Sequence, residues 1–256
     1  LVVAIAVLLY VFKGDPEMEA KVADQQVRTE IAEFYLSNPT PQDALDKIYA
    51  QHPKGMVYIP DGPFLSGRLH SSLTKNATDM NATRKESLAN KQDVAGFMID
   101  AFEYPNQMNG VPKARVTGME AEKLCAEQGK RLCTAVEWEK ACKGAQSFVY
   151  SYGDIWDPEL CGEGFNDLGT WKSGSFKSCR SQWGVFDMSG GFAEWTATAP
   201  SGDKNRRFIK GGNTNVERGT RCAFSTDDNI AFANFSMSFR CCRDVDAPQI
   251  PSTPDE

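Results

Sequence analysis

The chain has 256 residues, a net charge of −6 at neutral pH and no run that is rich in lysine or arginine. Proteins that bind nucleic acid need a basic surface, so this composition argues against nucleic acid as a partner. A hydrophobic content of 41%, with five tryptophans and fifteen phenylalanines, is sufficient for one substantial globular core.

The N-terminal segment 1–13 begins with twelve uncharged, mostly apolar residues, LVVAIAVLLYVF. A helix of that length spans about 18 Å, less than the ~30 Å hydrocarbon core of a bilayer. We interpret the segment as a transmembrane helix whose start lies upstream, which anchors the rest of the chain to a membrane. The alternative is the apolar region of a signal peptide, although no small-residue cleavage site follows Phe12.

Residues 14–54 are predicted to form a helical stalk between the anchor and the globular domain. Residues 17–37 are polar and carry apolar residues at loose helical spacing, and a proline-containing break follows. A second short helix is expected from Pro41, with Thr40 as its N-cap. A spacer is the favoured interpretation, and a helix that binds a partner is the alternative.

The globular domain is predicted to span residues 55–243, with short strands and two helices. The helices are expected at Val116–Gln128 and at Thr134–Cys142, where Thr134 and Glu137 match a capping box. The other expected elements are strands in 56–67 and 96–106, a surface loop at 67–95, short elements after 143 and a disordered, acidic tail at 244–256.

Eight cysteines lie between residues 125 and 242, and none lies in the first 124 residues. Such a set is compatible with disulfides, metal sites or buried thiols. No C-x-x-C motif occurs, and the two histidines, His52 and His70, lie upstream of every cysteine, so a zinc site is disfavoured. Disulfides are the better interpretation, and they predict a periplasmic or other extracytoplasmic location.

A series of phrases in order along the chain carries a family resemblance. The chain resembles the formylglycine-generating enzyme family, also called the sulfatase-modifying factor family, over residues 55–243. The resemblance implies an α+β fold related to C-type lectins, with little regular secondary structure for its size. The phrases are GMVYIPDGPF (55–64), FMIDAFEYPN (97–106), GKRLCTAVEWEKACKG (129–144), YSYGD (150–154), GVFDMSGGFAEWT (184–196), IKGG (209–212), TRCA (220–223) and SFRCC (238–242).

The resemblance also implies a pairing of the cysteines. Two pairs follow the family pattern, and we infer two more from the cysteines that remain. If the vicinal cysteines lie on a strand, their side chains point to opposite faces and each can take its own partner. The four expected disulfides are Cys125–Cys241, Cys142–Cys222, Cys133–Cys242 and Cys161–Cys179.

The chemistry of the family is not expected in this chain. Enzymes of the family oxidise a substrate cysteine with two active-site cysteines and a thiolate-bound copper ion, placed between the GG turn and the RC pair. The corresponding stretch, Asn213–Arg221, contains no cysteine. Hydroxyl and carboxylate groups do not replace a thiolate as nucleophile and copper ligand. We therefore predict no catalytic residues, no copper and no histidine-rich iron site.

Calcium is the one cofactor for which the resemblance leaves candidate ligands. Glu194 occupies an acidic position of a family calcium site, but Gly191 stands where the family has an asparagine. A second site has Gly162 where the family has asparagine, with Asp167 nearby. Carboxylate and carbonyl oxygens are the ligands that calcium prefers. We retain Glu194 and Asp167 as candidate calcium ligands.

Three functions remain compatible with the sequence. The favoured one is a non-catalytic, membrane-anchored domain that serves as a scaffold or accessory subunit and contacts integral membrane or extracytoplasmic proteins. The first alternative is a lectin-like module that binds glycan or peptide, and the second is an enzyme with altered chemistry. The expected binding surface includes Asn213, Asn215, Glu217 and Arg218.

Overall fold

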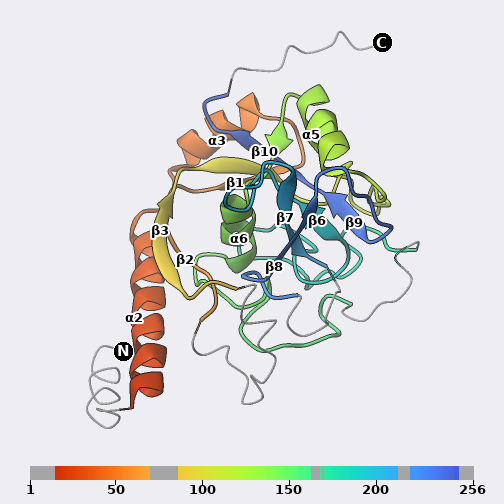
Figure 1. Ribbon diagram of the computed structural model, residues 1–256. Coiled ribbons are helices and arrows are strands. Elements are labelled where there is room, and N and C mark those ends of the chain that lie inside the picture. The colour runs from red at the N-terminus through yellow and green to blue at the C-terminus, as the bar shows by residue number, and fades with distance from the viewer. Residues whose placement is uncertain (1–14, 70–85, 163–167, 169, 213–219, 248–256) are drawn as a thin grey trace.

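The computed structural model describes residues 15–69, 86–162, 168, 170–212 and 220–247, which form a mixed α+β fold (Figure 1). The predicted anchor, residues 1–13, falls outside the described residues. Within the described part of the chain, no helix is both long and apolar enough to cross a membrane. The helices are α2 (Pro16–Ser37), α3 (Gln42–Gln51), α5 (Gly118–Glu127) and α6 (Ala135–Lys143).

The strands are short, as predicted, and form three small sheets among the described residues. The first is antiparallel, with the order β1 (Met56–Ile59), β4 (Phe97–Asp100), β10 (Cys241–Asp244) and β5 (Arg131–Leu132). The second pairs β2 (Gly62–Ser66) with β3 (Asn90–Val94). The third has the order β8 (Ser225–Asn229), β7 (Arg206–Gly211), β6 (Ala193–Trp195) and β9 (Met237–Phe239), and β6 runs parallel to β9.

Helix α6 lies at the centre of the molecule, between the sheets (Figure 1). Its predicted capping box is confirmed: the Glu137 amide donates to the Thr134 hydroxyl, and the Thr134 amide donates to the Glu137 carboxylate. Trp138 on this helix is fully buried and packs with Ile59, Ile99 and other core residues. The predicted helix at 116–128 is also present, and Thr117 forms a second capping box there.

Helix α2 packs against the domain, so the prediction of a spacer at residues 14–54 is wrong for this helix. Its Ile31 side chain is fully buried in an apolar cluster with Leu65 and Val149. The Tyr35 hydroxyl donates to the Pro63 carbonyl at 2.8 Å. The loose apolar spacing that predicted the helix thus marks a core-facing stripe, and the boundary predicted at residue 55 cuts through a packed interface.

Strand β3 falls inside the surface loop predicted at 67–95. It pairs with β2 along its whole length, from Gly62 opposite Val94 to Ser66 opposite Asn90. Its sequence, NKQDV, has no apolar alternation because the strand is an exposed edge that contributes little to the core. Residues 70–85 of the predicted loop and residues 248–256 of the predicted tail lie outside the described residues.

Candidate functional site

Every cysteine of the chain is crosslinked, and free cysteines are absent. The four disulfides are Cys125–Cys241, Cys133–Cys242, Cys142–Cys222 and Cys161–Cys179, the same four that the family resemblance implies. A cystine has no thiolate, so none of these sulfurs can act as a nucleophile or a copper ligand in this form. The cysteine chemistry of the family therefore has no donor in the oxidised chain.

Strand β10 separates the vicinal cysteines onto its two faces. Cys241 is bonded to α5 through Cys125, whereas Cys242 is bonded to Cys133, just after β5. Side chains alternate along a strand, so neighbouring cysteines can serve two partners. Strand β10 is thereby crosslinked from both of its faces. Within the sheet it lies between β4 and β5.

Arg240 and Glu194 form a fully buried ion pair next to β10. Arg240 Nε and Nη2 each donate to one carboxylate oxygen of Glu194 at 2.7 Å, in a two-point contact. Trp138 Nε1 also donates to Glu194 at 2.8 Å. The Arg240 guanidinium also donates to three backbone carbonyls, from Nη1 to residues 100 and 101 and from Nη2 to residue 186. We name this set the Arg240 network.

The Arg240 network bears on the calcium prediction. Both oxygens of Glu194 already accept hydrogen bonds from Arg240 or Trp138, and its side chain is 0% exposed. A calcium ion at this carboxylate would compete with a bonded guanidinium. Asp167, the second candidate ligand, lies outside the described residues. Within those residues, no group of three or more His, Cys, Asp or Glu side chains has the geometry of a metal site.

Two further buried carboxyl groups, Glu103 and Asp187, lie beside the Arg240 network. Burial, together with the charge of Asp187, raises the pKa of Glu103 to about 8. Burial also raises the pKa of Asp187 to about 6. One oxygen of each is held, by the Ser173 hydroxyl and the Gly174 amide respectively, and the other has no hydrogen-bond partner. This pair therefore retains a proton at neutral pH.

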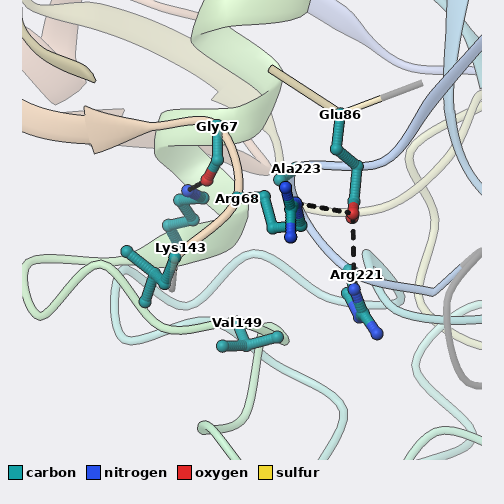
Figure 2. A pocket seen from close by; sticks show the side chains of 8 residues that line it. Gly67, Arg68, Glu86, Lys143, Val149, Arg221 and Ala223 are labelled. Carbon is teal, nitrogen blue, oxygen red and sulfur yellow. Dashed lines mark hydrogen bonds and ion pairs between the residues drawn. The ribbon is translucent and has the colours of Figure 1, made fainter. Parts of the chain in front are cut away.

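A second charged cluster surrounds Glu86, which lies close to Arg68 and Arg221 (Figure 2). Arg221 Nη1 donates to Glu86 Oε2 at 3.3 Å, and Arg68 Nε lies 3.8 Å from the same oxygen. Four buried polar atoms have no hydrogen-bond partner: Arg68 Nε, Arg68 Nη1, Arg221 Nε and Glu86 Oε1. We name these three residues the Glu86 cluster.

Lys143 and Lys210 lie next to the Glu86 cluster but are fully bonded. Lys143 Nζ donates to the Leu65 carbonyl at 2.7 Å and pairs with Glu139, while Lys210 Nζ pairs with the other oxygen of Glu139 at 3.2 Å. Two lysines and two arginines thus face the two carboxylates Glu86 and Glu139, an excess of positive charge in a buried region. Among these six charged residues, the buried atoms without a hydrogen-bond partner belong to the Glu86 cluster.

The cavity at the Glu86 cluster is small. Its volume is about 10 Å³, and its lining includes Gly67, Lys143 and Val149 besides the three charged residues. That space admits about one water molecule or a single ligand atom. The predicted binding residues Asn213, Asn215, Glu217 and Arg218 lie outside the described residues, although Arg221 follows them closely in sequence.

Several of these residues were not singled out from the sequence. Arg240 and Arg221 stand within the quoted phrases SFRCC and TRCA, where only the cysteines carried an interpretation. Glu86 had no signal, because it lies in a polar stretch that predicted a loop. His52 is buried, with Nδ1 2.7 Å from Arg243 Nη1, and burial lowers its pKa. We therefore assign His52 a structural role, in contact with Arg243.

Comparison with solved structures identifies the fold. PvdO from Pseudomonas aeruginosa has 16% sequence identity and a TM-score of 0.56, covering 74% of this chain and 94% of that chain. CarF has 17% identity and a TM-score of 0.54, covering 76% and 99%. Treponema denticola variable protein 1 has 14% identity and a TM-score of 0.54, covering 74% and 94%.

A family model identifies the sequence. The model of the sulfatase-modifying factor enzyme 1-like domain matches residues 102–245, more than half of the chain. The matched region contains all eight cysteines, the Arg240 network and Arg221. The chain therefore belongs to the sulfatase-modifying factor enzyme 1-like family, the formylglycine-generating enzyme family that its motifs predict.

Proposed function

We propose that the chain is a non-catalytic member of the family, anchored in a membrane by residues 1–13, with its domain on the extracytoplasmic side. In this proposal the domain is an accessory or scaffold subunit of a membrane protein complex. The observation that carries the proposal is the use of every cysteine in a crosslink. A domain with four disulfides fits an oxidising compartment and has no thiolate for the family reaction.

The small size of the cavity at the Glu86 cluster supports the same conclusion. It lies where the chain returns from the stretch that carries the active-site cysteines in the enzymes of the family. A volume of about 10 Å³ has no room for a peptide side chain.

An exposed apolar patch is our candidate for the contact with a partner. Met119 on α5 and two phenylalanines of the β8–β9 connection, Phe232 and Phe235, are 51%, 42% and 61% exposed. The Met119 amide donates to the Ile230 carbonyl at 3.4 Å, which holds α5 against this connection. Exposed clusters of large apolar side chains are typical of protein interfaces.

Photocrosslinking in the native membrane tests the proposal. A photoreactive phenylalanine analogue at Phe235 should crosslink the chain to a specific integral membrane subunit. The matched control places the same analogue at Glu159, an exposed position outside the patch, where no such product is expected. A chain that gives only monomer at both positions and purifies without stoichiometric partners would contradict the proposal.

The alternative of an enzyme with family chemistry has its own test. The purified, oxidised chain is incubated with copper and a peptide that contains a sulfatase-type cysteine. We expect the cysteine to remain unchanged in the mass spectrum, because no thiolate is present to bind copper or attack. Conversion of that cysteine to formylglycine would overturn the non-catalytic assignment.

A further inference from the structure

The segment 148–152 borders two different cavities. Val149 lines the small cavity at the Glu86 cluster, whereas Phe148, Ser151 and Tyr152 line a larger cleft of about 370 Å³. That volume is within the range of small-molecule sites and is far larger than the first cavity. The cleft is used neither by the Arg240 network nor by the apolar patch around Phe235.

The lining of the cleft combines aromatic rings with exposed polar groups. Phe148, Tyr152 and Trp183 supply the rings, and Arg180 and Gln182 are among the polar residues. Six of the nine described lining residues carry hydroxyl, amide or guanidinium groups, and none is an aspartate or glutamate. The cleft therefore offers several hydrogen bonds, flat apolar faces and one positive charge.

Contacts with α2 and with Asp157 fix the positions of the aromatic residues of the cleft. The Tyr35 ring packs edge-on against Trp183 with ring centroids 5.2 Å apart, and Arg28 lies 6.0 Å from the centre of the Phe148 ring. The Tyr152 hydroxyl donates to the Asp157 carbonyl at 3.2 Å. The rings are thus positioned before any ligand arrives, which lowers the entropic cost of binding.

Of the polar residues of the cleft, Gln182 is fixed by a hydrogen bond and Arg180 is exposed. Gln182 Oε1 accepts a hydrogen bond from the Gln146 amide at 3.0 Å, so the orientation of its amide group is fixed. The Arg180 side chain is exposed, and its guanidinium has no ion pair within the described part of the chain. A planar guanidinium with free N–H groups is well suited to a carboxylate or sulfate.

We propose that this cleft binds a saccharide that carries a carboxylate or sulfate group. Sugar rings present apolar C–H faces to aromatic side chains, and their hydroxyls need both donors and acceptors, which the exposed Ser178 and Gln182 provide. Arg180 would pair with the acidic group. A proline-rich peptide is the competing ligand, but grooves for such peptides are lined mainly by aromatic and apolar surface, and this lining is mostly polar.

This inference goes beyond the proposed function and does not depend on it. The saccharide and the protein partner would occupy different surfaces, so the crosslinking experiment at Phe235 and a binding experiment at the cleft can fail separately. A domain that binds an acidic saccharide with no partner subunit would disprove only the accessory role.

Saturation-transfer NMR on the full chain in detergent micelles tests the proposal. The probes are glucuronic acid, a sulfated disaccharide, the neutral sugar N-acetylglucosamine and a proline-rich decapeptide. We expect transfer to the ring protons of the acidic saccharides and quenching of tryptophan fluorescence through Trp183. Transfer to the decapeptide alone, or to none of the four probes, would overturn the proposal.

Variants separate a site in the cleft from nonspecific attraction. Arg180→Gln should weaken binding of the acidic saccharides on the order of tenfold, as expected for loss of a charge-assisted hydrogen bond. The matched control is Lys177→Gln, an exposed cation three residues away that does not line the cleft. Both side chains are exposed, so both variants should fold. Equal loss in the two variants would indicate nonspecific electrostatics and contradict the site.

Discussion

The Arg240 network and the Glu86 cluster both bury arginine against glutamate, but they bond it differently. Arg240 contacts Glu194 through two N–H groups at 2.7 Å, and backbone carbonyls accept from the rest of the guanidinium. In the Glu86 cluster, two arginines share a single carboxylate oxygen at 3.3 and 3.8 Å, and three of their buried N–H nitrogens have no partner.

The difference separates a fully bonded ion pair from an incompletely bonded cluster. A buried ion pair stabilises a fold only when nearly all of its donors and acceptors are paired, because desolvation costs several kcal/mol per ion. The Arg240 network meets that condition and joins β6, α6 and the residue before β10. The Glu86 cluster does not meet it, and it lies where this chain departs from the cysteine pattern of its family.

Replacement of Arg240 should have the largest effect. Arg240→Met leaves the Glu194 carboxylate buried without its charge partner, and we expect the free energy of unfolding to fall by about 3–5 kcal/mol. Urea denaturation with the disulfides intact measures the loss. A decrease of less than about 1 kcal/mol would show that the network does not hold the framework together.

The pH dependence of stability shows whether Glu103 can ionise beside the Arg240 network. The pKa of Glu103 is raised from 4.5 to about 8 in the folded chain, so the native state binds more protons than the unfolded state between these values. The contribution of Glu103 to stability should therefore be greatest below about pH 4.5 and be lost as the pH rises through 8, with a total on the order of 5 kcal/mol.

The Glu103→Gln variant isolates this contribution. It should flatten the decline, so that the variant is more stable than the parent at pH 9 and similar to it at pH 4.5. Glu159→Gln, at an exposed position, serves as the control and should leave the pH profile unchanged. Identical profiles for parent and Glu103→Gln would mean that the carboxyl is ionised in the native state at neutral pH.

Replacement of Arg221 tests the less completely bonded cluster. Arg221→Met removes one of two cations around Glu86 and also removes a buried N–H nitrogen without a partner. Arg68 still faces the carboxylate, so we expect a loss of only about 1–2 kcal/mol in unfolding free energy. A loss as large as that of Arg240→Met would erase the distinction between the two clusters.

Removal of an exposed ion pair should have the smallest effect on stability. Arg206 on β7 donates to Asp227 on β8, and both side chains are more than a third exposed. Solvent screens such a pair, so Arg206→Gln should shift the midpoint of urea denaturation only slightly, by less than either buried arginine substitution. A larger change would indicate that burial is not what separates these ion pairs.

The sequence predicted the elements that carry strong local signals. Thr134 and Glu137 predicted the start of α6, because a capping box needs only residues three positions apart. The ordered motifs predicted the family and the four cysteine pairs. By contrast, β3 was missed, since its polar residues acquire strand structure only through pairing with β2.

The charged clusters were missed for a related physical reason. Glu86 meets Arg221 across 135 residues, and Glu194 meets Arg240 across 46, so their partnership arises from folding and has no local pattern. The spacer interpretation failed in the same way for α2. Ile31 and Tyr35 gave a weak apolar stripe, and the surface that they cover is assembled from β2 and the segment near Val149.

The double crosslinking of β10 has a consequence for biogenesis. The Cys161–Cys179 bridge joins residues 18 positions apart, whereas the two bridges of β10 span 116 and 109 positions and use nearly the last residues of the domain. During synthesis from the N-terminus onward, Cys125 and Cys133 emerge long before their partners. Until the final strand arrives, their thiols can exchange with other disulfides, so a chain truncated before residue 241 would expose two reactive cysteines.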